Sequence, residues 1–511
     1  MNIWIVSIGN SDVQLKTRDN WNNLYRQVRS QLNDRNFQPV QVEEEESFTV
    51  PARVMGIVYG QNLDDKFYTD LHFPILDALS KKLTGKLLPD KIIVILSNQE
   101  SVFTAQDKRL KKCPYWQDTC KLQPILAKYF QINFTRLQAE NIQFIELNPE
   151  SKNEGLDNWD QALGLVRERL SQLTFKPEDK IYVSHQAGTP AISSAVQFVS
   201  IAKFGKQVRF LVTNEYEQER TDIIASSKYL KGIQLQEAKM LLKRFDYSGV
   251  ERLLSSYWEN NNLSPEEEKL QRSLKIAIQW NFANFDNFAQ ELGDNAQERL
   301  QHWWWTGYEA AYLAVVRLEQ GNTVEALFHS FRAVESLICK WAEYNFPKHI
   351  EYEKQGKYKN AKSPKLKKTI LNEYPNYLST GKKPRKSMLN QLNNDGMIGL
   401  YSEALYQLIQ TVKPECQDET HVMNVVWGEA RDYRNVLFHQ MLGLQESELF
   451  EAWGTNKKDN WKKKLLNCLN FISGQTIFTS IPKASLMFQV HQDLMKALDD
   501  YEGKIYENTK E

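Results

Sequence analysis

The sequence lacks the cysteine spacings that hold metal ions or build a disulfide framework. Its five cysteines include no Cys-x-x-Cys pair, so neither a zinc site nor a set of disulfides is expected. Long apolar runs are missing too, since nothing approaches the roughly eighteen residues of a membrane span. The short apolar N-terminus has no basic lead-in of the kind found in signal peptides. We therefore expect a soluble, cytoplasmic protein with no membrane partner and no bound metal or cofactor.

An excess of charge of one sign is also missing. Sixty-four Lys and Arg residues balance 64 Asp and Glu residues, so any nucleic-acid partner must be met by a local patch. The nucleotide-binding fingerprints are absent as well: no Walker lysine appears, and no G-x-G-x-x-G follows a predicted strand. What remains is an ordinary globular composition, with 41% hydrophobic residues, in a chain of 511 residues. That length predicts several domains.

Strand-like and helix-like segments alternate over residues 1–225. The predicted strands are Asn2–Ile8, Arg53–Tyr59, Lys91–Leu96, Gln143–Leu147, Lys180–Ser184 and Gln207–Thr213. Segments of helical periodicity lie between several of them, including Leu156–Leu173 and Ala191–Phe204. This order predicts an α/β domain with a mostly parallel, Rossmann-like sheet. Ligands of such sheets bind at the carboxyl ends of the strands.

Two loops of small polar residues would lie at that edge. One follows the first strand, and the other leads into a helix for which Thr189 is a suitable N-cap and Pro190 a suitable first residue. A helix N-terminus offers free amide groups to a phosphate. Each loop taken alone also fits an ordinary turn between strand and helix. The candidate ligand-binding residues are Gly9, Asn10, Ser11, Asp12, His185, Gln186, Gly188 and Thr189.

The pattern becomes helical after about residue 225. We expect a helical connector over 226–300 and an all-α domain over 301–511, which includes the amphipathic segment Thr323–Tyr344. The aromatic run Trp303–Trp305 fits a helical core better than a base-stacking platform. A basic insertion at about 354–386 carries eleven Lys or Arg residues against the single acidic Glu373. It suits either a single-stranded nucleic acid or a solvated loop.

The run Arg434-Asn435-Val-Leu-Phe-His439 carries the chemistry of the helical half. Histidine moves protons near neutral pH and arginine holds a phosphate, the two tasks of phosphodiester cleavage. On a regular α-helix, five positions at about 100° each place Arg434 and His439 about 140° apart. Either the helix is distorted within the motif, or two subunits combine their residues at one site. The candidate catalytic residues are Arg434, Asn435 and His439.

Together these motifs resemble the CRISPR-associated ancillary ribonucleases of type III systems. In that family a CARF domain (CRISPR-associated Rossmann fold) precedes a HEPN ribonuclease domain. The resemblance rests on Ser7-x-Gly9-x-Ser11-Asp12, on Gly188-Thr189-Pro190 and on the R-N-x-x-x-H motif. The segment Ala326–Ile338 is similar to the family's earlier HEPN helix. The second loop departs from the pattern, because the family often has more glycine there.

The resemblance implies a switchable enzyme of antiviral defence. A homodimer would bind cyclic oligoadenylate in the CARF domains as allosteric activator, and its HEPN domains would cut single-stranded RNA without a metal. The products would carry 2′,3′-cyclic phosphate and 5′-hydroxyl ends. Two alternatives stay open. A DNA-binding regulator could use the same sensing sheet, and the CARF domain could act as a ring nuclease that degrades its own ligand.

Overall fold

The chain folds into two compact units, Met1–Ile233 and Gln234–Glu511. The computed structural model describes residues 1–32, 35–42, 46–150, 155–213, 220–258, 263–354, 362–379, 385–440 and 442–507. None of the helices within these residues is long and apolar enough to cross a membrane.

The first unit is built on a six-stranded sheet of order β10-β9-β8-β1-β6-β7. Its strands are parallel except for β10, which pairs antiparallel with β9. Strand β1 lies in the middle of the sheet, with β6 and β7 on one side and β8, β9 and β10 on the other. The direction in which successive strands follow one another across the sheet therefore reverses beside β1. The strands are β1 (Asn2–Ser7), β6 (Lys91–Ser97), β7 (Ile142–Leu147), β8 (Lys180–Ser184), β9 (Val208–Thr213) and β10 (Thr221–Ala225).

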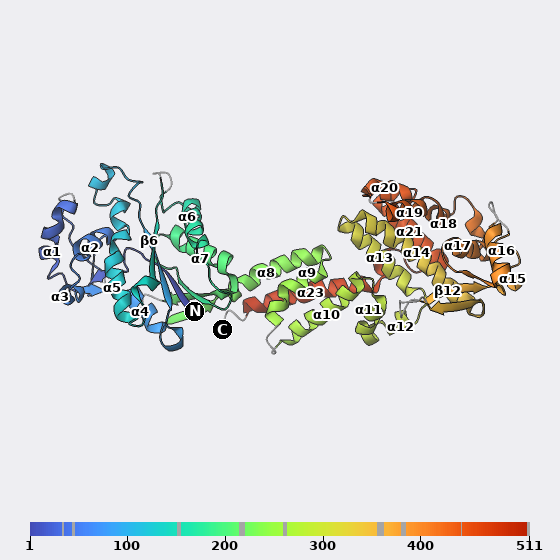
Figure 1. Ribbon diagram of the computed structural model, residues 1–511, viewed down its shortest axis with the longest axis horizontal. Helices are drawn as coiled ribbons and strands as arrows, with labels where there is room; N and C mark the ends of the chain where they lie inside the picture. Colours follow the sequence, from blue (N-terminus) through green and yellow to red (C-terminus); the bar gives the residue numbers. More distant parts are fainter. Residues whose placement is uncertain are drawn as a thin grey trace. The chain divides into compact units, whose positions relative to one another are not determined.

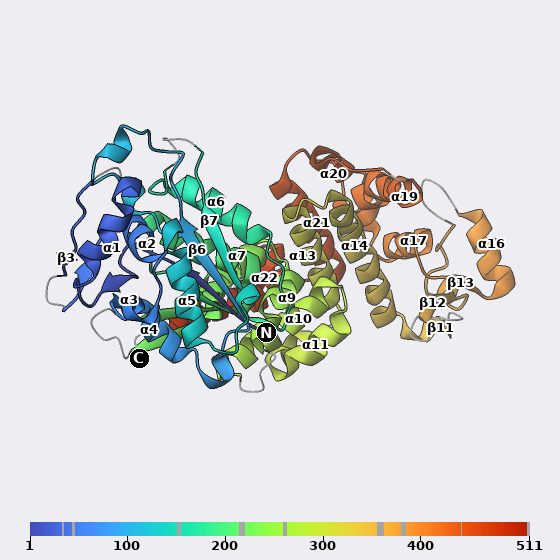
Figure 2. The ribbon, with the colours of Figure 1, turned by 60° about the vertical axis from the view of Figure 1, so that its left-hand side comes forward.

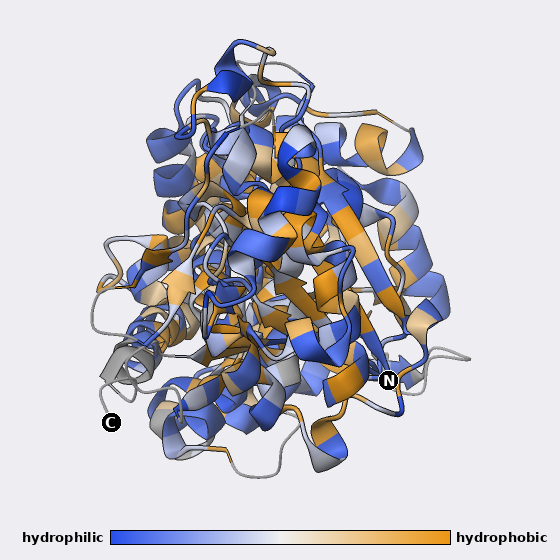
Figure 3. Cartoon of the chain, turned by 90° about the vertical axis from the view of Figure 1, so that its left-hand side faces the viewer, coloured by the Kyte–Doolittle hydropathy of each residue, from blue (hydrophilic) through white to orange (hydrophobic). Residues whose placement is uncertain are grey.

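Helices cover both faces of this sheet (Figure 1). Side chains alternate along each strand, so Ile3 and Ile5 of β1 pack with α6 and α7, whereas Trp4 and Val6 pack with the helices of the opposite face. The central strands are accordingly mostly apolar, and orange segments mark strands inside the sheet in Figure 3. The covering helices are α6 (Trp159–Ser171) and α7 (Pro190–Phe204) on one face, and α2 (Ala52–Tyr59), α4 (Pro74–Lys82) and α5 (Gln123–Asn133) on the other.

One predicted strand, Arg53–Tyr59, is wrong. The segment forms α2 (Ala52–Tyr59), of which seven residues are buried. A short, continuously apolar run has no periodicity that separates a buried strand from a buried helix. Gly56 lets this helix approach its neighbour closely, because a Cβ there would lie 2.2 Å from the carbonyl oxygen of Lys121. The helix is therefore held by contacts that the local pattern does not reveal.

A second, small sheet of order β3-β4-β2-β5 belongs to the first unit, with two short helices beside it. The sequence reading did not predict these strands, which have only two residues each. They are β2 (Gln14–Leu15), β3 (Val40–Gln41), β4 (Phe48–Thr49) and β5 (Leu71–His72), and the helices beside them are α1 (Trp21–Val28) and α3 (Asp65–Tyr68).

The second unit is mostly helical and has one continuous hydrophobic core. Helices α13 and α14 pack side by side in it (Figure 2), and Trp304 and Trp305 are buried as the core interpretation predicted. The helices are α8 (Ser226–Lys243), α9 (Tyr247–Trp258), α10 (Pro265–Asn281), α11 (Phe285–Leu292), α12 (Gln297–Leu300), α13 (Trp305–Glu319), α14 (Thr323–Asn345), α15 (Ile370–Glu373), α16 (Lys386–Asp395), α17 (Glu403–Val412), α18 (Val422–Val425), α19 (Arg431–His439), α20 (Glu446–Ala452), α21 (Lys458–Ser473), α22 (Ile481–Ala484) and α23 (Leu486–Glu507).

A buried carboxylate, that of Glu309 on α13, fixes the start of α23. It accepts hydrogen bonds from Trp280 Nε1 of α10 at 2.9 Å, and from Ser485 Oγ and Leu486 N at 2.6 Å each. Burial raises the pKa of Glu309, while these donors act in the opposite direction. Helix α23 then packs along α10, so the end of the chain joins the helices of the predicted connector.

The helical half is not purely α. A three-stranded antiparallel sheet lies beside α16 (Figure 2). Its strands are β11 (Ile350–Lys354), β12 (Lys362–Lys367) and β13 (Met397–Gly399). Strands β11 and β12 fall in or next to the basic insertion, which the sequence reading treated as a loop.

Candidate functional site

A cavity of about 280 Å³ opens at the carboxyl edge of the main sheet. Gly9 and Asn10 after β1 meet Gly188 and Thr189 after β8 in its wall. Since β1 and β8 are neighbouring parallel strands, their carboxyl ends bring the two loops together, as predicted. The remaining wall residues are Ile8, Ser97, Gln99, Pro114, Gln117, Asp118, Thr119, Leu156 and Ile192.

The two loops touch through their backbones. A Cβ on Gly9 would lie 2.8 Å from the amide nitrogen of Gly188, a distance that real side chains do not tolerate. Gly188 itself has φ of +101°, a conformation that favours glycine. The hydroxyl of Ser7 donates to Ala187 O at 2.8 Å and ties the end of β1 to the second loop. Both glycines are therefore required by the geometry of this edge.

Helix α7 begins where the sequence predicted it. Thr189 is the N-cap, its side-chain oxygen accepts from Ile192 N at 3.2 Å, and Pro190 is the first helical residue. The same hydroxyl donates to Leu156 O at 2.6 Å. Among the described residues, those that line the cavity include neither Lys nor Arg. An anion in it would be met by backbone amides, hydroxyls and the positive end of the α7 dipole.

Not every predicted ligand residue faces this cavity. Asp12 is buried, and its carboxylate accepts from Gly9 N at 2.7 Å, so it shapes the loop. Gln186 is held by the backbone of Thr213, through bonds of 3.0 and 2.8 Å. Neither Asp12 nor Gln186 lines the cavity. The physical reason is that both side chains hydrogen-bond to other groups of the protein.

The remaining predicted residues of these loops divide in the same way. His185 Nδ1 lies 3.2 Å from Ser193 Oγ, and burial lowers the pKa of this histidine. Asn10 contributes to the cavity wall, but its Oδ1 accepts from Ala52 N at 2.7 Å at the start of α2. Ser11 is exposed.

Sequence reasoning missed the polar residues that β6 and the segment after it supply. Asp118 accepts from Gln99 N at 2.8 Å, and its carboxylate pairs with the fully buried Arg53 at 2.9 Å. Arg53 also stacks over the ring of Tyr115 at 3.9 Å. A buried arginine in an apolar run was the one signal available, because a buried guanidinium requires a partner. The ion pair with Arg53 fixes the carboxylate of Asp118, and that carboxylate in turn holds the backbone amide of Gln99. Both Asp118 and Gln99 line the cavity.

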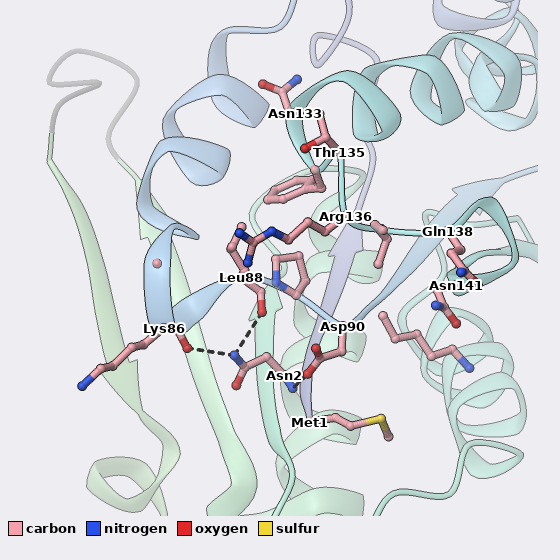
Figure 4. Close-up of a pocket in the computed structure, with 15 residues that line it drawn as sticks. Met1, Asn2, Lys86, Leu88, Asp90, Asn133, Thr135, Arg136, Gln138 and Asn141 are labelled. Atoms are coloured by element: carbon pink, nitrogen blue, oxygen red, sulfur yellow. Dashed lines mark hydrogen bonds between the residues drawn. The ribbon is translucent and has the colours of Figure 1, made fainter.

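A larger cavity, of about 1400 Å³, lies at the opposite edge of the same sheet, where β1, β6 and β7 begin (Figure 4). Asn2 spans part of it by donating to Lys86 O and Leu88 O at 3.0 Å each. Ligands of parallel sheets bind at the carboxyl edge, and this cavity lies at the amino edge. The smaller cavity is therefore the candidate ligand site.

In the second unit, the motif residues Arg434, Asn435 and His439 all lie on α19. A π-helical turn, Val426–Ala430, directly precedes this helix; such turns are frequent at functional sites. From Arg431 to His439 the helix is regular, so the distortion lies before the motif and not within it. Arg434 and His439 of one chain therefore point about 140° apart.

Arg434 is held in place by neighbours on two elements. Its Nη2 lies 3.4 Å from Glu335 Oε2 on α14, and its Nη1 donates to Asn435 Oδ1 at 2.7 Å. The guanidinium also stacks over Phe331 at 4.7 Å. Glu335 in turn accepts from Ser402 N at 3.2 Å. This arrangement fixes the cation and leaves the side chain 30% exposed.

His439 is the last residue of α19 and is exposed. No described residue hydrogen-bonds to its ring, whose neighbour is the edge of Phe438 at 5.2 Å. Several large apolar side chains of α19 and of the segment after it are exposed. We call this set the α19 apolar patch: Tyr433 (37%), Val436 (45%), Phe438 (70%) and Leu442 (52%). Val436 lies three positions before His439 and so on nearly the same side of the helix, and exposed apolar side chains there favour an interaction surface.

The described lysines of the basic insertion are mostly paired. Lys365 lies 2.5 Å from Glu353, and Lys367 lies 3.1 Å from Glu351, across the β11–β12 pair. Tyr377, one of the interleaved aromatics, is fully buried. Residues 355–361 and 380–384, with Lys357, Lys359, Lys382 and Lys383, lie outside the described residues. The acidic residues just before the insertion thus offset part of its charge.

Among the described residues, no group of three His, Cys, Asp or Glu side chains is placed to hold a metal ion. The candidate residues of the second unit are therefore described by their own contacts on α19, and those of the first unit by the cavity at the carboxyl edge of its sheet.

The geometry defines a two-unit protein: a Rossmann-like sheet with a polar cavity at its carboxyl edge, followed by a helical unit that exposes an arginine–histidine pair. No protein-family model matches the sequence, and no curated protein matches it either. A solved structure is similar: Enterococcus italicus Csm6 bound to cyclic hexa-2′-fluoro-hexa-dAMP, with 15% identity and a TM-score of 0.53. The match covers 97% of this chain and 100% of that one. The fold that the motif resemblance implied is thereby confirmed.

Proposed function

We propose that the protein is a cyclic-oligoadenylate-activated endoribonuclease of CRISPR antiviral defence. The observation that carries the proposal is the half-buried Arg434 and the exposed His439 on α19, in a chain whose whole fold is similar to a Csm6 bound to a cyclic hexanucleotide. The substrate is single-stranded RNA. Its own 2′-oxygen attacks the adjacent phosphate, which leaves 2′,3′-cyclic phosphate and 5′-hydroxyl ends.

In this mechanism the two motif residues divide the work. His439 transfers protons at the 2′-hydroxyl or at the leaving oxygen, a role typical of an accessible imidazole. Arg434 stabilises the charge that develops on the phosphate, and Asn435 and Glu335 orient its guanidinium. No step requires a metal ion, because the nucleophile belongs to the substrate and the charge is met by arginine.

The site combines residues of two subunits. Arg434 and His439 of one chain diverge by about 140° along a regular helix, so one phosphate would not meet both from a single α19. A two-fold axis near this helix would place His439 of one chain beside Arg434 of the other. The α19 apolar patch supports this arrangement, since a dimer would bury these exposed side chains.

The activator binds in the first unit. The amide-rich cavity at the carboxyl edge suits phosphates, and two copies of it around a two-fold axis suit a symmetric ring of nucleotides. Binding would act on the second unit only by favouring one arrangement of the dimer over another. Cyclic oligoadenylate is thus an allosteric effector in this proposal and not a cofactor.

RNA cleavage in EDTA tests the proposal. The purified protein is incubated with end-labelled single-stranded RNA and a panel of cyclic oligoadenylates, and the product ends are identified by mass spectrometry. We expect ligand-dependent cleavage that persists in EDTA and yields cyclic phosphate ends. A strict Mg²⁺ requirement, or 3′-hydroxyl products, would refute the metal-independent mechanism.

The alternative of a DNA-binding regulator has less support. Helices α8 to α11 share their hydrophobic core with α13, α14 and α23, so they do not stand apart as a small DNA-reading module. The ring-nuclease alternative is also weaker, because Gln186 and His185 are engaged with Thr213 and Ser193.

A further inference from the structure

A polar cavity of about 330 Å³ lies beside the nuclease helix in the second unit. Its size is near the lower end of the about 300–1,000 Å³ range of small-molecule sites. Helix α17 and the segment leading to α19 supply most of its wall. The wall residues are Arg385, Glu403, Tyr406, Gln407, Gln410, Gln417, Glu419, Asn424, Trp427 and Arg431.

Three glutamine side chains in this wall present their oxygens. Their amide nitrogens are used within the protein: Gln407 Nε2 donates to Glu403 Oε1 at 3.0 Å, Gln410 Nε2 to Cys416 O at 3.4 Å, and Gln417 Nε2 to Gln410 O at 3.1 Å. These bonds fix the orientation of each amide. Within the described residues no donor meets the three Oε1 atoms, so the wall offers a set of acceptors.

Two stacked aromatic residues form part of the same wall. Trp427 is 4% exposed, and its ring stacks on Tyr406, with centroids 4.8 Å apart and planes 11° from parallel. The cavity wall therefore combines acceptor oxygens with an aromatic pair.

The cavity is continuous with the catalytic helix through Arg431. This arginine lines the cavity and lies three residues before Arg434 on α19, on nearly the same helix face. Glu403 holds it at 3.3 Å and also pairs with Arg385 at 3.0 Å. Ser402, the residue before Glu403, donates its backbone N–H to Glu335, the partner of Arg434. A strand of RNA held by Arg434 would thus pass the mouth of this cavity.

We propose that this cavity receives a base of the RNA strand and selects bases with an exocyclic amino group. Glutamine oxygens accept hydrogen bonds from such an amino group. Unstacked bases of single-stranded RNA are read in this way, on their hydrogen-bonding edges. Uracil has no exocyclic amino group and is disfavoured. The inference rests on the proposed ribonuclease function and names its specificity pocket.

The test measures kcat/KM on short RNAs with a single cleavable linkage, varying one base at a time around the cut. We expect one position at which uridine lowers kcat/KM about tenfold or more, the range of a well-placed polar base contact. Replacing adenosine by purine riboside at that position, which deletes only the amino group, should have a similar effect. If the cavity bound a free nucleotide and not a base of the substrate, kcat/KM would not depend on the base at any one position of the RNA, and the proposal would be wrong.

The variants Gln407→Leu, Gln410→Leu and Gln417→Leu each remove one acceptor from the wall. Each should flatten the discrimination at that position, so that the ratio of kcat/KM between adenosine and uridine substrates falls towards one. Gln489→Leu is the matched control, because Gln489 pairs with Asp493 on its own exposed helix face. An unchanged base preference in all three variants, or no preference in the parent, would overturn the proposal. Failure of the parent to cleave any RNA would instead refute the ribonuclease function itself.

Discussion

Arg434 and His439 were accessible to sequence reasoning because their spacing and chemistry are local. Glu335, which orients Arg434, was not, since it lies 99 residues away along the chain. The same holds for Asp118 and Arg53, which meet only in the folded sheet. Individual side chains that react can be found by type and spacing. Those that position them depend on tertiary packing, which a single sequence does not display.

The substitution His439→Ala tests the reacting group directly. We expect RNA cleavage to fall by about 10²–10⁴-fold, the usual effect of removing a positioned proton-transfer group. Because the side chain is exposed and unbonded to described residues, the thermal unfolding midpoint should not change. Rate measurements at saturating RNA check the first expectation and calorimetry the second. Near-parental turnover in the variant would remove His439 from the mechanism.

At the scale of elements, most of the main sheet followed from the sequence, and the exceptions have physical reasons. Strands β1, β6, β7, β8 and β9 were predicted to within about two residues, because apolar runs bounded by polar turns are strong signals. Helix α2 was taken for a strand, since a short run with seven of its eight residues buried has no usable periodicity. The edge strand β10 and the two-residue strands were missed because pairing, not composition, defines them.

The contact between the first and second loops gives a prediction about sensing. In Gly9→Ala the added Cβ meets Gly188 N at 2.8 Å, so one loop must shift and the cavity must change shape. We expect weaker binding of cyclic oligoadenylate by isothermal calorimetry and weaker activation, with basal cleavage retained. Gly164→Ala on α6 is the matched control, as nothing lies within 4 Å of its new Cβ. Equal affinity in the two variants would place the ligand elsewhere.

The packing of α9 against α23 predicts a pH dependence. His491 on α23 is buried beside Tyr247, whose hydroxyl lies 3.1 Å from Nδ1, and burial lowers the pKa of His491 from 6.5 to about 4. As the pH falls, the unfolded chain therefore binds this proton first. The histidine's contribution to stability is complete above pH 6.5 and is lost between pH 6.5 and 4, by at most about 1.4 kcal/mol per unit.

Urea unfolding at pH 7 and pH 5 measures this effect. The urea midpoint of the parent should fall more between the two values than that of His491→Gln, which has no group to titrate at this position. If both proteins lose the same stability, the buried histidine does not contribute to the pH dependence.

For the whole molecule, an α/β half and a helical half were predicted from the sequence, but the way in which the helical half is assembled was not. The predicted connector shares one core with the last helix of the chain, and a three-stranded sheet interrupts the helices. Both features arise from contacts between distant segments. The angle of about 140° between the directions of Arg434 and His439, in contrast, follows from their spacing on a regular helix. Because α19 is regular over these residues, this expectation holds in the structure.

The α19 apolar patch predicts a dimer that is required for cleavage. Val436→Asp places a charge where a partner would bury an apolar side chain, so we expect dissociation in analytical ultracentrifugation together with loss of RNA cleavage. Val40→Asp is the control, because Val40 is 67% exposed on β3 of the first unit. A fully active monomeric Val436 variant would contradict the composite site.

Mixing the two catalytic variants tests the same point without disturbing the interface. Arg434→Ala and His439→Ala homodimers should both be inactive, whereas their mixture contains dimers in which one site has an intact Arg434 from one chain and an intact His439 from the other. Partial recovery of cleavage after mixing is expected. No recovery, despite exchange of subunits shown by mass spectrometry, would mean that each chain builds its site alone.

In the proposed mechanism, a ligand bound in the first unit controls RNA cleavage at α19. The single-turnover cleavage rate in EDTA, measured with and without cyclic oligoadenylate for the parent, Gly9→Ala and His439→Ala, tests this control. We expect strong activation of the parent, weak activation of Gly9→Ala with its basal rate preserved, and no cleavage by His439→Ala under either condition. Equal rates with and without every ring size tested, or ligand-stimulated cleavage by His439→Ala, would contradict it.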